Sequence, residues 1–153
     1  MKRILLFLCL ISLSLSSCTD DDNCGECFTP PPTFAFDLVA EDTGENVFAS
    51  GEYDQDDVLV FDRLNDDEER DFEFITENNL NYIVFTDIGE ETETVNLQIR
   101  LGGNDIFTLY IDAERKDDGC CTFTEYKEFK IEGSEFETNT QTGVYAILVK
   151  KIW

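Results

Sequence analysis

Residues 94–113, TVNLQIRLGGNDIFTLYIDA, contain the clearest strand pattern of the sequence. Apolar and polar residues alternate along its first half: Val95, Leu97, Ile99 and Leu101 against Thr94, Asn96, Gln98 and Arg100. A period of two is typical of a strand with one buried face. Gly102-Gly103 predicts a tight turn into a second strand, Ile106 to Ala113, with Phe107, Leu109 and Ile111 pointing inward. The stretch therefore predicts an antiparallel β-hairpin.

Short strands are expected on both sides of this hairpin. They are predicted at 34–39, 58–61, 71–74, 80–86 and 121–131, around Phe136, and at 144–152. Asn78-Asn79 is expected to turn, Gly133-Ser134 to close a second hairpin, and Asp66 to Arg70 could form one polar helical turn. Val58 to Phe61, a continuous apolar run, is typical of a strand covered on both sides.

Eight or nine such strands, without any sustained helical period, indicate an all-β antiparallel β-sandwich. An up-and-down barrel is the alternative, but it needs more even strand lengths than 58–61 offers. The pattern is similar to small transthyretin-like or immunoglobulin-like domains, a likeness of architecture that carries no function. We expect three parts: a signal at 1–17, a stem at 18–32 containing three consecutive prolines, and the sandwich at 33–153.

The first residues carry a targeting signal. Lys2 and Arg3 precede a short apolar run, followed by small residues, as in a secretory signal peptide. About 12 apolar residues are too few to span a bilayer, which takes roughly 20. Leu15-Ser16-Ser17-Cys18 resembles the lipobox of bacterial lipoproteins. That resemblance implies cleavage before Cys18 and a diacylglycerol on its sulfur, and therefore a membrane partner through the lipid; secretion with a free Cys18 is the alternative.

An acidic run, Asp20 to Asp22, follows the anchor. It resembles the surface-export tag of lipoproteins from Bacteroidota-type bacteria, although blocks of like charge are usually hydrated leashes. The resemblance implies attachment to the outer membrane, with the outward-facing leaflet favoured over the periplasmic one.

Charge and composition limit the function. Two of the 11 basic residues lie in the signal, so nine remain against 34 acidic ones, a formal net charge of −25. This balance argues against nucleic acid as a partner, because a basic face is needed for it. The chain has no histidine, and beyond the signal its only serines are Ser50 and Ser134, both in expected turns. The common nucleophile arrangements are therefore excluded. A carboxylate-based hydrolase is the remaining enzymatic alternative, but a small sandwich offers little cleft for it, and we expect no enzyme and no catalytic residues.

Four cysteines remain beyond the anchor: Cys24, Cys27, Cys120 and Cys121. In an oxidising compartment an even number indicates disulfides. Two crossed pairings would tie the stem to the strand that starts at Cys121, and each would close a loop worth about 4–5 kcal/mol as an upper figure. Pairing within Cys24–Cys27 and within Cys120–Cys121 is the third possibility. Redox chemistry and a structural metal are weaker alternatives, because adjacent cysteines suit one metal tetrahedron poorly.

The acidic clusters do not match the twelve-residue calcium loop. A Ca²⁺ site at a loop end would draw on Asp54, Asp56 and Asp57, which stand closest together, whereas solvated loops are the plainer interpretation. A glycan would need exposed flat aromatic rings. The candidates are five tyrosines and the single tryptophan: Tyr53, Tyr82, Tyr110, Tyr126, Tyr145 and Trp153.

The sequence thus predicts a lipid-anchored outer-membrane lipoprotein that acts as a non-enzymatic structural or interaction module, with a possible protein or glycan partner. The alternative is a glycan- or Ca²⁺-binding accessory lipoprotein.

Overall fold

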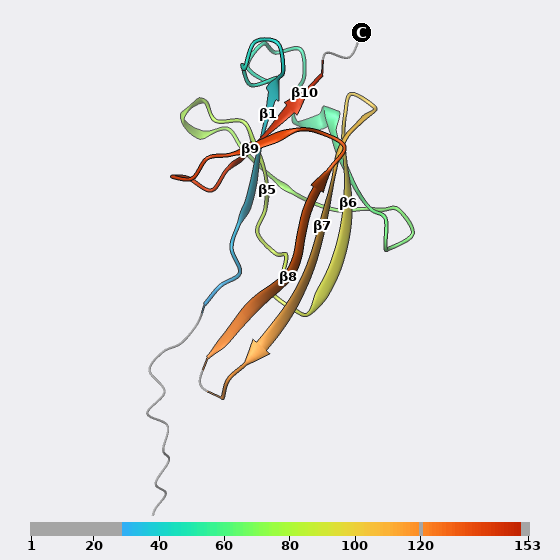
Figure 1. Ribbon diagram of the computed structural model, residues 1–153. Helices are drawn as coiled ribbons and strands as arrows, with labels where there is room; N and C mark the ends of the chain where they lie inside the picture. Colours follow the sequence, from blue (N-terminus) through green and yellow to red (C-terminus); the bar gives the residue numbers. More distant parts are fainter. Residues whose placement is uncertain (1–28, 120, 151–153) are drawn as a thin grey trace, which may run out of the picture.

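Two five-stranded sheets form a β-sandwich in the computed structural model, which describes residues 29–119 and 121–150 (Figure 1). Sheet A has the order β3-β2-β6-β7-β8, and sheet B the order β4-β5-β1-β10-β9. Sheet A contains β2 (Val58–Asp62), β3 (Glu68–Glu69), β6 (Glu93–Leu101), β7 (Asn104–Asp117) and β8 (Thr122–Glu132). Sheet B contains β1 (Phe34–Ala40), β4 (Glu73–Ile75), β5 (Tyr82–Phe85), β9 (Phe136–Thr138) and β10 (Tyr145–Val149). Two short 3₁₀ turns, Gln55–Asp57 and Glu77–Asn79, complete the elements.

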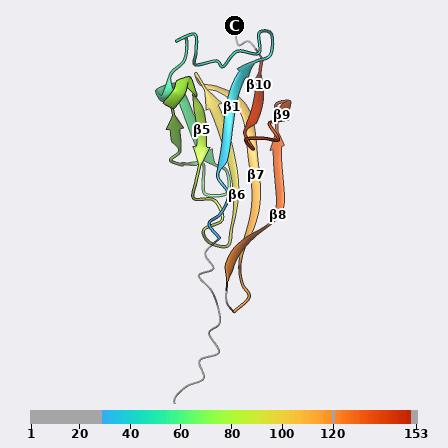
Figure 2. The same cartoon turned by 90° about the vertical axis from the view of Figure 1, so that its left-hand side faces the viewer.

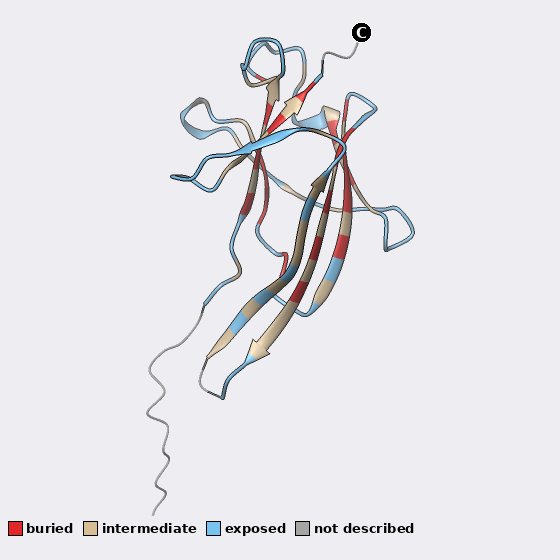
Figure 3. Cartoon of the chain, viewed as in Figure 1, coloured by how far each residue is buried: buried red, intermediate tan, exposed pale blue. Residues whose placement is uncertain are grey.

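The core lies between the two sheets and follows the predicted alternation. The inward-facing apolar residues of β6 and β7 are buried, as are Phe34, Phe36 and Leu38 of β1, and Gln98 and Ile106 are buried in addition (Figure 3). Figure 2 views the sandwich with sheet B in front of sheet A. The expected hairpin at Gly102-Gly103 is confirmed, with both glycines at positive φ (+56° and +83°). Because the strands form two separate sheets, the barrel alternative is wrong.

Several sequence expectations need correction. The described chain forms ten strands instead of the expected eight or nine. The sequence did not indicate β3, because this strand pairs only two residues and has no apolar pattern. It occupies the stretch where a polar helical turn was considered. β1 and β10 pair in parallel, so the sandwich is not purely antiparallel. β2 is buried on one face only, since Val58 and Val60 are buried and Leu59 and Phe61 are partly exposed.

Gly133-Ser134 does not close a hairpin. β8 belongs to sheet A, and β9 pairs with β10 in sheet B, so these two residues carry the chain from one sheet to the other. Ser134 Oγ donates to the Ile106 carbonyl (2.7 Å), which fixes the crossover on β7. A Gly-Ser pair permits a positive φ at the glycine (+94°) without specifying which strand follows it.

The β7–β8 hairpin extends beyond sheet B at the end where the chain enters β1 (Figures 1 and 2). Its inner face there is polar, and Arg115 lies at its centre. The Arg115 guanidinium donates to Thr122 Oγ1 (3.1 Å), Thr124 Oγ1 (2.8 Å) and the Thr29 carbonyl (3.3 Å). Thr29, in the described part of the stem, therefore contacts the hairpin where sheet B no longer covers it.

Candidate functional site

Basic side chains gather on sheet A. Apart from Lys150, every lysine and arginine of the described ranges lies in sheet A or in the segments flanking β3: Arg63, Arg70, Arg100, Arg115, Lys116, Lys127 and Lys130. The strands of sheet B contain none. Arg115 lies on the inner face of the β7–β8 hairpin, whereas Arg63, Arg100, Lys116, Lys127 and Lys130 give the outer face of sheet A both signs of charge.

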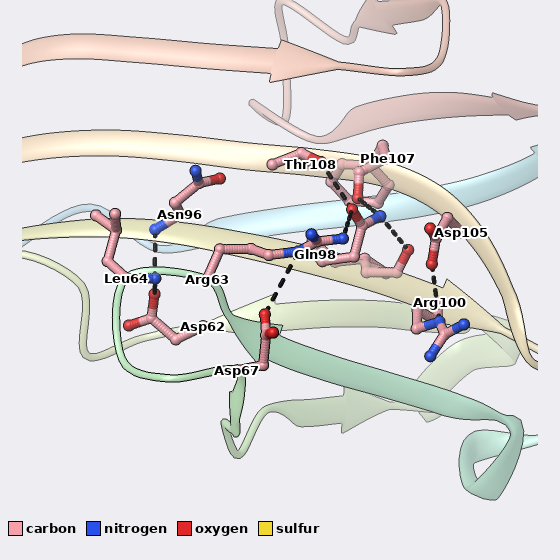
Figure 4. A network of polar contacts seen from close by, with 11 residues as sticks. Asp62, Arg63, Leu64, Asp67, Asn96, Gln98, Arg100, Asp105, Phe107 and Thr108 are labelled. Atoms are coloured by element: carbon pink, nitrogen blue, oxygen red, sulfur yellow. Dashed lines mark hydrogen bonds and ion pairs between the residues drawn. The ribbon is translucent and has the colours of Figure 1, made fainter.

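A polar groove of about 260 Å³ lies on this face, which we call the sheet A groove (Figure 4). Its lining residues come from β2, the loop after it, β6 and the start of β7: Phe61, Arg63, Asp67, Gln98, Arg100 and Asp105. The loop after β2 is held against β6, because Arg63 N donates to the Asn96 carbonyl (2.8 Å). Asp62 Oδ1 accepts from Leu64 N (3.0 Å), which closes the turn.

Gln98 forms the floor of the groove and is the one buried polar side chain in the described chain (8% exposed). Its Oε1 accepts from Arg63 Nη2 (3.0 Å) and Thr108 Oγ1 (3.2 Å). Its Nε2 donates to the Phe107 carbonyl (3.1 Å). Because buried polar groups are costly unless they are hydrogen-bonded, these contacts fix the amide and orient Arg63.

Two arginine–aspartate pairs flank that floor. Arg100 Nε lies 2.8 Å from Asp105 Oδ1, and Arg63 Nε lies 3.7 Å from Asp67 Oδ1. The Arg100 guanidinium also lies over the Phe61 ring, 5.9 Å from its centroid. The groove thus offers guanidinium donors and carboxylate acceptors side by side, with one aromatic ring beneath.

Further along the outer face of sheet A, charged side chains of β7 and β8 form ion pairs. Glu114 lies between two lysines, 2.6 Å from Lys127 Nζ and 3.0 Å from Lys116 Nζ. Hydrogen bonds from Lys127 and then Lys116 lower the pKa of Glu114, and they raise the pKa values of both lysines. These groups are solvent-exposed, so they shape the electrostatic surface more than they stabilise the fold. Lysines on β8 also discourage its free edge from pairing with another strand.

The predicted calcium ligands have a structural use. Asp54 caps the 3₁₀ turn: its side chain accepts from Asp56 N (2.9 Å), and its own N–H donates to Asp57 Oδ2 (2.9 Å). This reciprocal capping uses the carboxylates of Asp54 and Asp57 and the backbone N–H of Asp56. Within residues 29–119 and 121–150, no group of three ligating side chains could hold a metal ion. The calcium assignment stays a prediction without geometric support.

Most of the cysteine predictions fall outside the described residues, as do Cys18 and Trp153. Of the four expected disulfide cysteines only Cys121 is described, and Cys24, Cys27 and Cys120 are not. Cys121 directly precedes β8 at the tip of the hairpin, where its N–H donates to Asp118 Oδ1 (2.7 Å). The pairing stays a prediction.

The tyrosines do not form an aromatic platform. Tyr110 lies on the outer face of sheet A as predicted, but Lys130 Nζ lies over its ring at 5.7 Å. Tyr126 and Tyr145 pack against the core, and burial raises the pKa of both. Tyr53 packs against the core from the end loop, and Tyr82 lies on sheet B.

Sequence reasoning missed Gln98, Arg63 and Arg100 as site residues. The available signal was the polar side of the β6 alternation, which carries Gln98 and Arg100 but not Arg63. No family model, no curated protein and no solved structure matches the chain. The sheet A groove is therefore interpreted from its own geometry: it can bind polar groups and has no nucleophile in its lining.

Proposed function

We propose that the chain is a lipid-anchored lipoprotein of the outer membrane, facing the cell surface, whose sandwich is a non-enzymatic interaction module. Cleavage before Cys18 and lipidation of its sulfur supply the anchor, and two or three acyl chains are enough for lasting attachment. The lipobox and the acidic run after it support this address. In the described part of the chain no helix is long and apolar enough to cross a membrane.

The observation that carries the interaction role is the charge distribution between the two sheets. Paired charges on the outer face of sheet A give directional contacts and favour a partner with a complementary pattern. The buried Gln98 holds the groove in one shape, so its donors and acceptors are arranged before a partner arrives.

We propose further that disulfides fasten the stem to the β7–β8 hairpin. Thr29, two residues after Cys27, already lies against Arg115 beside Thr122 and Thr124, and Cys121 directly precedes Thr122. These contacts favour the two crossed pairings and leave both open. The sandwich would then stand close to the membrane.

Site-specific photo-crosslinking in intact cells tests the interaction role. A photoreactive residue at Thr94 or Glu132, both exposed on the outer face of sheet A, is expected to give a crosslinked partner. The matched position Glu137, exposed on sheet B, is expected to give none. External protease should remove the adducts if the protein faces outward. Equal adducts from all three positions, or none from sheet A, would contradict the proposal.

A glycan is the second candidate ligand, because the sheet A groove combines planar polar side chains with the Phe61 ring. Binding of a soluble polysaccharide should then weaken when Arg63 or Arg100 is replaced by alanine. An unchanged affinity in both variants would rule out this ligand for the groove.

A further inference from the structure

A second cavity, of about 220 Å³, lies at the end of the sandwich away from the stem. We call it the distal pocket. Ala40 at the end of β1, Val149 and Lys150 at the end of β10, and residues of the loop 42–53 line it. In Figures 1 and 2 this loop and the end of β10 lie together, opposite the tip of the β7–β8 hairpin. The sheet A groove shares no lining residue with it.

The loop that builds the distal pocket is hydrogen-bonded to β1 and β10 of sheet B. Val47 N donates to the Leu38 carbonyl (2.9 Å), and Glu41 N donates to the Val149 carbonyl (3.0 Å). Asn46 Nδ2 donates to Asp37 Oδ1 on β1 (2.7 Å) and to the Asn81 carbonyl (3.1 Å). The walls of the pocket are therefore formed before any ligand binds.

The interior of the pocket is apolar. Its apolar lining consists of Ala40, Val47, Val149 and Tyr53, and the other lining residues are polar or charged. The Tyr53 ring is held against Gly102, since a Cβ at that glycine would stand only 2.9 Å from Tyr53 Cε1. At about 220 Å³ the pocket is smaller than the roughly 300–1,000 Å³ of small-molecule sites. Its size suits a single side chain from a partner.

The charges of the pocket are mainly acidic. Asp42, Glu45 and Glu52 line it together with one cation, Lys150. None of these three carboxylates forms an ion pair within the described ranges. A side chain that fits must be apolar along its length and positive at its tip. Lysine and arginine have this form, and a tyrosine ring attracts their charged groups.

We propose that the distal pocket receives one lysine or arginine side chain of a partner polypeptide. The aliphatic part of this side chain lies along Val47 and Val149, and its charged group contacts the carboxylates. An anchoring side chain in a preformed pocket is the usual centre of a protein interface. The proposal does not depend on the lipid anchor, because the pocket is built entirely by the sandwich.

NMR titration of the ¹⁵N-labelled full chain in detergent micelles with small probes tests this proposal. The amide signals of the pocket report binding whether or not Cys18 is lipidated. The probes are acetyl-lysine amide and acetyl-arginine amide, with acetyl-norleucine amide as the uncharged control. We expect the cationic probes to shift the amide signals of Val47, Tyr53 and Val149, and to bind more tightly than norleucine. Glu45→Gln and Glu52→Gln should each weaken binding about two- to fivefold, as for partly exposed charge pairs.

The control variant is Glu137→Gln, which removes the same charge from sheet B and should leave binding unchanged. The proposal is overturned if norleucine binds equally well, or if shifts spread over the acidic surface and Glu137→Gln weakens binding as much. It is also overturned if the pocket signals respond only after residues 151–153 are removed, because the chain's own end would then fill the pocket.

Discussion

At the residue scale, Gly89 has the tightest surroundings of any glycine in the described chain. It lies at φ +92° after Ile88, and its N–H donates to Glu93 Oε1 (2.7 Å). Thr124 Oγ1 donates to the Gly89 carbonyl (2.6 Å), and Tyr126 Oη donates to the Ile88 carbonyl (2.9 Å). These contacts dock the turn between β5 and β6 on the inner face of β8.

Replacing Gly89 with alanine should therefore destabilise the fold. The new Cβ would stand 2.6 Å from Tyr126 Oη, which adds about 1–3 kcal/mol of overpacking to the cost of a positive φ. Gly44→Ala is the control, since Gly44 also has a positive φ (+70°) but open space around it. Urea denaturation should give a larger loss of unfolding free energy for Gly89→Ala. Equal losses would show that the packing on β8 is unimportant.

Asp37 is the second residue with a measurable signature. Burial raises its pKa above the ordinary 3.8, although the hydrogen bond from Asn46 partly opposes this. The folded state then binds this proton more tightly than the unfolded state, so the contribution of Asp37 to stability falls as pH rises above about 4. Asp37→Asn keeps the acceptor for Asn46 and removes the ionisation.

The unfolding free energy of Asp37→Asn, relative to the native chain, is expected to rise between pH 4 and pH 7. Denaturation at several pH values measures it, and Glu137→Gln corrects for the loss of one negative charge from an acidic molecule. Parallel pH curves for Asp37→Asn and the native chain would contradict the raised pKa.

At the scale of elements, β8 contains a bulge at Lys127. Tyr126 pairs with Ala113 and Glu128 with Asp112, so Lys127 has no opposite residue. The extra residue lets both Tyr126 and Phe129 pack against the core although they are three positions apart. A β7 bulge at Ile106 likewise leaves two neighbouring residues, Ile106 and Phe107, buried.

Two single-residue deletions, one at the bulge and one in the regularly paired part of β8, test the bulge at Lys127. Deleting Lys127 restores regular pairing and keeps Phe129 inward, so it should cost little. Deleting Lys130 places Phe129 next to Ile131 and turns one of them outward, which should cost up to about 3 kcal/mol. Both deletions remove one lysine, so the charge is matched. Thermal or urea unfolding measures the difference, and equal destabilisation would argue against the assigned bulge.

These elements also indicate how far the sequence could lead. The β6–β7 hairpin was predictable because its alternation is regular and Gly102-Gly103 permits only a tight turn. The partners of β9 and β10 were not, because β1 and β10 lie at opposite ends of the chain and no local pattern encodes parallel pairing. The sheet A groove was half predictable: the polar face of β6 was identified, but Arg63 reaches Gln98 only through a loop whose path depends on the fold.

At the scale of the whole molecule, the two ends of the sandwich differ. The stem meets the β7–β8 hairpin at one end through Arg115, and the distal pocket lies at the other (Figure 1). Between them, the outer face of sheet A carries the paired charges. If Cys18 is lipidated and disulfides join the stem to the hairpin, the distal pocket faces away from the membrane. The sheet A groove is then accessible from the side.

Intact-mass spectrometry of the protein isolated from its native membrane measures the lipid on Cys18 and the state of the thiols together. We expect a chain that begins at Cys18 and carries diacylglycerol, usually with an added N-acyl group. Its mass should also be lower by the four hydrogens lost in two disulfides, and reduction should restore them. An unmodified chain that begins at Met1 with all its thiols reduced would contradict the account.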